Sequence, residues 1–165
     1  MVIIVFGLPG SGKSYFAARL AARLNARYVN SDELRLRLLP KRTYTDAEKL
    51  LVYEAMLAAM ETAINEQQTI VLDATFYKEA IRKRFERKAA SLQQTIIYIE
   101  VKAAEDIIAE RLAKPRKVSE ADFAVYQKLK LEFEPLQQQH LLVLSSNNDI
   151  EPSLQQAIEY INQHT

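Results

Sequence analysis

The chain has 165 residues, of which 48% are apolar and 26% are charged, as in an ordinary soluble domain. Its net charge of +1 argues against a protein that binds long nucleic acids, and its lack of cysteine excludes disulfides, cysteine-bound zinc and thiol nucleophiles. No stretch approaches the ~18 apolar residues that a membrane span needs, and the apolar start Met1–Phe6 is too short for a signal peptide. We therefore expect one domain over residues 1–165, cytoplasmic and without a membrane partner.

Segments typical of strands and helices alternate along the chain. The first is a continuous apolar run that ends at Gly7, which indicates a strand buried on both faces. Ser31 is expected to cap the second helix, Thr45 and Glu48 form a capping box before the third, and Ser119 begins another such box. The expected strands are Val2–Phe6, Arg27–Val29, Thr69–Leu72, Thr95–Val101 and Leu141–Leu144. The expected helices are Lys13–Leu24, Asp32–Leu39, 45–66, Lys78–Leu92, Ala104–Leu112, 119–133 and Ser153–Asn162.

This alternation predicts crossover connections and a five-stranded parallel sheet inside a three-layer α/β/α sandwich. The long third helix has an apolar stripe at spacings of three and four, formed by Leu50, Tyr53, Leu57, Met60 and Ile64. Ligands of such sheets bind outside the carboxyl ends of the strands, so functional residues are expected just after each strand.

The segment Gly7–Ser14 fits the phosphate-binding pattern G-x-x-x-x-G-K-[ST] at every fixed position. It follows an apolar strand and precedes a helix, so its backbone N–H groups and the helix dipole are expected to surround a phosphate. Lys13 is predicted to reach the β- and γ-phosphates, and Ser14 to bind Mg²⁺. The predicted nucleotide-binding residues are Leu8, Pro9, Gly10, Ser11, Gly12, Lys13, Ser14 and Tyr15.

Two carboxylates follow expected strands. Asp32 comes shortly after the second strand. It is either a helix-cap or first-turn residue that favours the helix dipole, or a general base that takes a proton from an acceptor hydroxyl. Beside a phosphate loop we favour the base. Asp73 follows the third strand and fits a carboxylate that holds Mg²⁺.

Two segments are rich in basic residues. Arg111 and Arg116 flank Pro115 between two expected helices, which suits either a solvated helix end or a lid, at about residues 112–119, that closes over the transferred phosphate. The segment Arg82–Lys88 has one apolar face, so we interpret it as a solvated helix surface rather than a nucleic-acid-binding face.

Together, the motif Gly7–Ser14, the segment Asn30–Arg35, the run Leu72–Phe76 and the late segment from Arg111 to Pro135 resemble the small predicted kinases of the P-loop kinase superfamily. This AAA-type group includes the kinase domain of phage-type polynucleotide kinase, zeta toxins and gluconate kinases. The resemblance covers about the whole chain and implies the strand order 2-3-1-4-5 and phosphoryl transfer from ATP to a hydroxyl.

The resemblance also implies residue roles. Asp32 corresponds to the catalytic base, Arg35 to the arginine that holds substrate phosphate, and Asp73 to the third-strand aspartate, which places Asp32, Arg35 and Asp73 at the substrate. Arg111 corresponds to a nucleotide-binding arginine of the lid and Arg116 to a catalytic one, although one extra residue separates them here. Residues 145–148 would border the adenine.

The working hypothesis is an ATP-dependent kinase that uses Mg²⁺, with Lys13, Asp32 and Arg116 as catalytic residues and an unidentified hydroxyl compound as acceptor. Two alternatives remain: a nucleotide-binding switch module with little phosphotransfer, and a polynucleotide 5′-hydroxyl kinase. Ser31 stands where polynucleotide kinase has an arginine, and the chain has no phosphatase domain, so nucleic acid is the less favoured acceptor. No guanine-reading aspartate motif is present, which favours ATP over GTP.

Overall fold

The computed structural model describes residues 1–115 and 120–165. Within them, five parallel strands form one sheet in the order β2-β3-β1-β4-β5, as the resemblance implied. The strands are β1 (Val2–Phe6), β2 (Arg27–Asn30), β3 (Ile70–Ala74), β4 (Ile96–Lys102) and β5 (Leu141–Leu144). The helices are α1 (Lys13–Arg23), α2 (Ser31–Leu38), α3 (Asp46–Asn65), α4 (Glu79–Ser91), α5 (Glu105–Leu112), α6 (Phe123–Glu132) and α7 (Glu151–Gln163).

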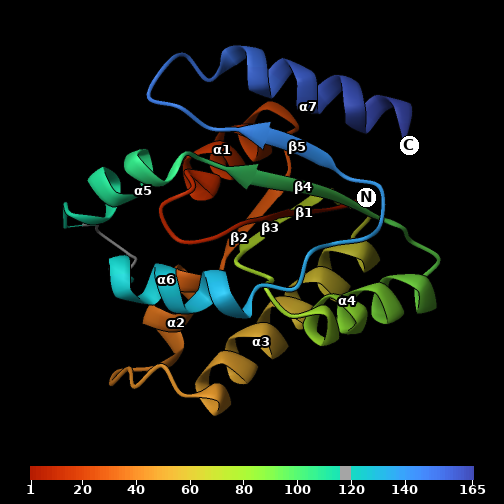
Figure 1. Ribbon diagram of the computed structural model, residues 1–165. Helices are drawn as coiled ribbons and strands as arrows, with labels where there is room; N and C mark the ends of the chain where they lie inside the picture. Colours follow the sequence, from red (N-terminus) through yellow and green to blue (C-terminus); the bar gives the residue numbers. More distant parts are fainter. Residues whose placement is uncertain (116–119) are drawn as a thin grey trace.

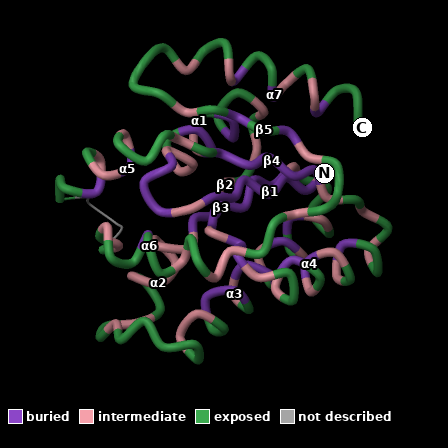
Figure 2. The backbone as a smooth tube through the Cα atoms, viewed as in Figure 1, coloured by how far each residue is buried: buried purple, intermediate pink, exposed green. Residues whose placement is uncertain are grey.

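The predicted three-layer α/β/α sandwich is confirmed. Helices α1 and α7 cover one face of the sheet and α3 and α4 the other, while α2, α5 and α6 lie toward the ends at which the strand arrows point (Figure 1). Successive side chains of β1 lie on opposite faces of the sheet: Ile4 packs toward α3 and α4, and Val5 packs toward α1 and α7. Both core layers are fully buried along the central strands (Figure 2), which explains why β1 has no polar residue.

The strand register brings the predicted site residues together. Val5 on β1 lies beside Asp73 on β3, and Asp73 lies beside Asn30 on β2. Because all three strands run parallel, the loops that follow them meet at one edge of the sheet. Strand β3 runs to Ala74, so Asp73 lies inside the strand rather than just after it, which fixes its backbone.

Two local predictions were wrong. Ser31 does not cap α2, because the helix begins one residue earlier and Asn30 accepts a hydrogen bond from the Glu33 N–H at 3.0 Å. Leu50 does not belong to the buried stripe of α3, since it is 49% exposed, whereas Val52 and Met56 are buried. The cap of α6 is Asp122, and Ser119 lies outside the described residues.

Arg82 on α4 is a third correction. It was assigned to a solvated helix surface, but only 1% of it is exposed. Its guanidinium donates to the carbonyl oxygens of Phe76 and Glu134, each at 2.7 Å. Arg82 therefore joins the loop after β3 to the segment after α6, in the helix that packs on the sheet.

Candidate active site

The loop from Gly7 to Ser14 turns tightly between β1 and α1. Gly12 has a φ of 89°, and a side chain there would come within 2.6 Å of the Ser145 Oγ atom. At Gly7 a side chain would come within 2.3 Å of the Val101 carbonyl oxygen. Both positions therefore require glycine, for conformation and for space.

Helix α1 begins directly after this loop without a capping side chain or an acidic residue in its first turn. Its first N–H groups are therefore not used by a cap, and the positive end of the helix dipole faces the loop. Lys13 is the first residue of the helix and lines a cavity next to the loop. This arrangement suits the binding of a polyphosphate.

Arg111 on α5 connects the phosphate loop to the segment after β5. Its guanidinium donates to the Gly10 carbonyl oxygen at 3.1 Å, and also to Ser145 Oγ at 3.1 Å and to the Ser146 carbonyl oxygen at 2.9 Å. Burial lowers the pKa of Arg111, but an arginine remains charged at neutral pH. Arg111 is thus held beside the predicted phosphate and adenine positions.

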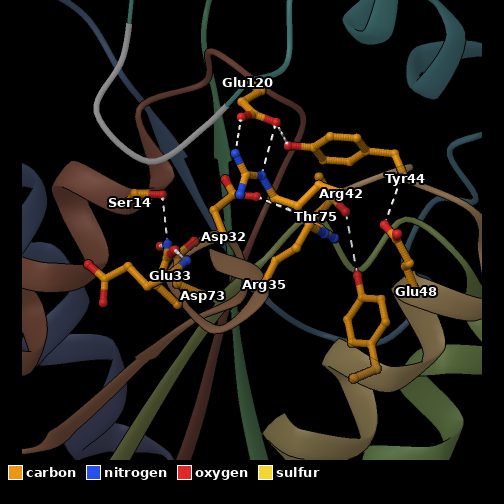
Figure 3. Close-up of polar contacts among 12 residues, drawn as sticks. Ser14, Asp32, Glu33, Arg35, Arg42, Tyr44, Glu48, Asp73, Thr75 and Glu120 are labelled. Atoms are coloured by element: carbon orange, nitrogen blue, oxygen red, sulfur yellow. Dashed lines mark hydrogen bonds and ion pairs between the residues drawn. The ribbon is translucent and has the colours of Figure 1, made fainter. Parts of the chain in front are cut away.

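Asp73 is fully buried at the centre of a polar network. Its Oδ2 atom accepts hydrogen bonds from the Asn30 amide at 2.5 Å and from the Tyr28 hydroxyl at 2.7 Å. The Asn30 amide also lies 3.3 Å from Ser14 Oγ, which joins the carboxylate to the phosphate loop (Figure 3). Burial, together with the charge of Asp73, raises the pKa of the Tyr28 hydroxyl well above its usual range, so Tyr28 stays a donor.

The residues around Asp73 fit a magnesium ion. Asp73 Oδ1 is buried and has no hydrogen-bond partner among the described residues. Mg²⁺ takes oxygen ligands and usually uses one or two carboxylates, with nucleotide phosphates and water completing its shell. Within residues 1–115 and 120–165, no cluster of three or more acidic or histidine side chains could hold a metal alone. Asp73 and Ser14 are therefore suited to a metal that arrives with a nucleotide.

Asp32 and Arg35 lie one turn apart on α2. Arg35 Nη1 donates to Asp32 Oδ1 at 2.9 Å, and the two side chains are 12% and 28% exposed, respectively. The ion pair fixes the carboxylate where it remains accessible to a ligand. Asp32 is not the cap of α2, because Asn30 is, but it lies in the first turn of the helix, where the dipole favours an acidic side chain.

A cavity of about 220 Å³ lies between the phosphate loop, α2, α3, α6 and the loop after β3. Polar residues of its lining include Lys13, Asp32, Arg35, Lys49 and Lys128. Its other walls are largely aromatic and aliphatic, formed by Pro9, Tyr44, Val52, Tyr53, Tyr77, Val125 and Leu129. Few polar groups in a mainly apolar hollow are typical of a small-molecule site.

Tyr44 and Glu120 close one side of this cavity, although they come from distant segments. The Tyr44 hydroxyl donates to Glu120, and Arg42 donates to the same carboxylate at 2.7 Å (Figure 3). The Arg35 guanidinium lies 5.1 Å from the centre of the Tyr44 ring. Tyr44 has a φ of 54°, a conformation that is uncommon for tyrosine and is held here by Glu48, which accepts from the Tyr44 N–H at 2.7 Å.

The predicted site residues fall into three groups. The phosphate loop, Asp32, Arg35 and Asp73 gather at one end of the sheet, and Arg111 lies on the nucleotide side of the loop. The Tyr15 side chain is 56% exposed and lies against Arg19, so only its backbone suits phosphate. Arg116 lies outside the described residues, as does the second half of the predicted lid, residues 116–119.

Sequence reasoning missed several residues of this site. Asn30 ends a strand beside the phosphate loop, so the rule for carboxyl strand ends could have identified it as a ligand-site residue. Tyr28 and Glu120 had no such signal, because their partners Asp73 and Tyr44 lie 45 and 76 residues away in the chain.

A family model described as an AAA domain matches residues 2–136. The chain belongs to this AAA-domain family. The match includes the phosphate loop, Asn30, Asp32 and Asp73, so the core of the site lies within the family region.

Solved structures with the same fold are P-loop kinases and related proteins. A sugar kinase from Janibacter sp. HTCC2649 is 14% identical with a TM-score of 0.76, covering 98% of this chain and 94% of that chain. The Kti12 protein of Chaetomium thermophilum, solved with ADP-AlF3, is 22% identical with a TM-score of 0.75, covering 99% and 98%. The APS kinase CysC of Mycobacterium tuberculosis, solved with AMPPNP and APS, is 16% identical with a TM-score of 0.73, covering 98% and 96%. At these identities the likeness establishes the fold alone, and that fold is shared with the sugar kinase and the APS kinase.

Among curated proteins, the uncharacterized protein Rv2004c of Mycobacterium tuberculosis is 26% identical over 121 residues, or 66% of this chain. The match covers 24% of that protein, so the chain spans about a quarter of the length of the curated relatives it matches. Among the described residues, no helix is both long and apolar enough to cross a membrane.

Proposed function

We propose that the protein is a kinase that transfers the γ-phosphoryl group of ATP, with Mg²⁺, to a hydroxyl group of a small molecule. One observation supports this most directly: Lys13 of the phosphate loop and Asp32 of α2 line the same cavity. A nucleotide switch needs the phosphate loop but has no use for an accessible carboxylate in a cavity beside it. The phosphate donor and a proton acceptor would thus share one enclosed space.

The chemistry assigns a task to each residue. Lys13 and the N–H groups at the start of α1 hold the β- and γ-phosphates. The acceptor hydroxyl enters the cavity beside Asp32, forms a bond to the γ-phosphorus and gives its proton to the Asp32 carboxylate as the bond to the β-phosphate oxygen breaks. Arg35 keeps that carboxylate in position through the 2.9 Å contact. Magnesium, held by Ser14 and Asp73, would neutralise phosphate charge.

The arrangement favours a small acceptor over a nucleic-acid end. The cavity of about 220 Å³ is enclosed on several sides. The basic face of α4 is also less available than its sequence indicated, because Arg82 is buried and Arg84 and Lys88 pair with glutamates of α3. Kinase relatives by fold, including the sugar kinase and the APS kinase, support transfer to small molecules.

Phosphate transfer from γ-labelled ATP to a panel of acceptors tests this proposal. The panel contains sugars, sugar acids, nucleosides, amino-alcohol antibiotics, nucleotide sugars and 5′-hydroxyl oligonucleotides. Asp32→Ala should abolish the labelled product, whereas Asp106→Ala, an exposed aspartate on α5, should not. Tight ATP binding with no labelled acceptor and only slow hydrolysis that persists in Asp32→Ala would support the switch function instead.

A further inference from the structure

The acceptor cavity contains cations beyond those that the proposed transfer uses. Four basic residues line it, Lys13, Arg35, Lys49 and Lys128, against two acidic residues, Asp32 and Glu120. Asp32 is paired with Arg35, and Glu120 is paired with Arg42, which does not line the cavity. With Lys13 assigned to the nucleotide, two lysine charges remain uncompensated by the acidic groups of the lining.

Lys49 is the more buried of these two lysines. Its side chain is 25% exposed, and its amine lies 3.4 Å from the Tyr77 hydroxyl, which is also in the cavity wall. Its charged contact is with Asp46 at 3.3 Å, but that side chain is 97% exposed. Such a solvated pair contributes little. The Lys49 amine otherwise contacts the hydroxyl and the ring of Tyr77, so none of the described carboxylates that line the cavity neutralises its charge.

Helix stability does not explain a lysine at this position. Lys49 lies in the first turn of α3, where the helix dipole disfavours positive charge. The turn is already capped by Thr45 and has acidic residues at Asp46 and Glu48. Apart from the solvated pair with Asp46, a cation held there, beside a mainly apolar cavity, is available to a negatively charged ligand.

The walls next to Lys49 restrict the ligand further. Tyr53 and Tyr77 are each only 6% exposed, and Val52 is 1% exposed. The Tyr53 hydroxyl is already used, since it accepts from the Phe76 N–H at 3.2 Å and contacts Thr75 Oγ1 at 3.4 Å. These side chains therefore offer mainly ring and aliphatic surface, which suits the apolar face of a compact ring.

We propose that Lys49 binds an anionic group of the acceptor, and that the acceptor is a small hydroxylated ring compound with its own carboxylate or phosphate. This inference rests on the proposed kinase function, because it names the substrate class of the same cavity. The cavity of about 220 Å³ is below the ~300–1,000 Å³ of sites for drug-sized ligands, which agrees with an acceptor of about monosaccharide size.

Matched acceptor pairs test the anion requirement. Glucose is compared with glucuronate and glucose 6-phosphate, and adenosine with adenosine 3′-monophosphate. Each pair is measured with wild type, Lys49→Gln, Lys49→Arg and the control Lys83→Gln on α4. In wild type an anionic member should have a KM lower than its neutral partner by about 10- to 100-fold, the size expected for one charged hydrogen bond in a shielded site. Lys49→Gln should remove that advantage with little change in kcat, Lys49→Arg should keep most of it, and Lys83→Gln should leave it intact.

Binding to the protein with a non-hydrolysable ATP analogue separates this inference from the kinase proposal. The same compounds and inorganic phosphate are titrated by calorimetry, and binding of at least one anion should depend on Lys49. Lys49-dependent binding without any transfer would contradict the kinase function and retain the anion site. Three results would overturn the anion site and leave the kinase function standing. They are Asp32-dependent transfer to neutral compounds only, an advantage for anions that persists in Lys49→Gln, and absence of binding by every anion.

Discussion

The proposed nucleotide side and the proposed acceptor side of the candidate active site are built in different ways. The nucleotide side consists of backbone: a glycine loop, the uncapped start of α1 and main-chain oxygens that fix Arg111. The acceptor side consists of side chains from α2, α3, α6 and two loops, joined by contacts such as Tyr44 to Glu120. Backbone geometry gives tight but general phosphate binding, whereas a side-chain wall can change with few substitutions. The comparison explains how one fold can serve kinases of many substrates.

Removal of Lys13 should have the largest effect on the nucleotide side. Lys13→Ala deletes the cation at the start of α1, where charge would develop on the transferred phosphate in the proposed reaction. Loss of one such group typically costs about 10²–10³-fold in rate. Transfer measured at saturating acceptor should fall by that factor while the folded structure, followed by circular dichroism, is retained. A variant with nearly normal transfer would show that the backbone alone suffices.

Loss of Arg82 should have the largest effect on the framework of the acceptor side. Arg82→Met leaves the carbonyl oxygens of Phe76 and Glu134 without their donor and should lower the free energy of unfolding by ~3 kcal/mol. The exposed Arg87 on the same helix provides the control, and Arg87→Met should change stability by less than ~0.5 kcal/mol. Urea unfolding measures both, and equal midpoints for the two variants would contradict a structural role for Arg82.

A substitution of Tyr28 tests the proposed magnesium site at Asp73, which lies between the nucleotide side and the acceptor side. Tyr28→Phe removes one of the two donors to Asp73 Oδ2 while keeping the ring. Because groups that orient a metal ligand typically matter by ~10–100-fold in metal affinity, the apparent affinity for Mg²⁺ should fall at least about tenfold. The measurement is the Mg²⁺ dependence of binding of a fluorescent ATP analogue, which needs no turnover. Tyr160→Phe, on α7 away from the site, is the control, and equal Mg²⁺ dependence in both variants would dismiss the role of Tyr28.

The smallest effect is expected at Glu120, where the acceptor side closes. The Arg42 guanidinium and the Tyr44 hydroxyl hold the pKa of Glu120 at about 2, below its usual value. Because this pKa is depressed, the contact is complete above the usual glutamate pKa of about 4.3 and is lost as the pH falls toward 2. Tyr44→Phe should raise the Glu120 pKa and increase the KM for the acceptor a few-fold, with the KM for ATP unchanged. Carboxyl NMR titration of Glu120 checks the pKa, and a wild-type midpoint near the usual value would refute the contact.

Much of the nucleotide side and the parallel five-stranded sheet could be predicted from the sequence pattern, whereas the strand order was implied by the resemblance to P-loop kinases. The motif Gly7–Ser14 is contiguous, so its geometry is encoded locally, and the apolar runs mark the strands. The acceptor side could be predicted only in part: Asp32 and Arg35 were named, but Glu120 was not, because long-range packing brings it to the cavity. The sequence predicts Arg82 at the surface because arginine is charged, although the residue lies on the buried side of α4. The roles of the predicted residues, including Arg116, remain predictions.

In the proposed mechanism, the phosphate loop with Lys13 binds ATP, and a separate residue, Asp32, accepts the proton. The substitution Asp32→Asn separates these two functions. The substitution keeps the size of the side chain and removes its ability to accept a proton. Transfer to the best acceptor of the panel should fall by about 10²–10⁴-fold, the usual contribution of a general base, while the Kd for ATP stays unchanged. Nearly normal transfer in Asp32→Asn would contradict the account, and so would a loss of ATP binding that matches the loss of transfer.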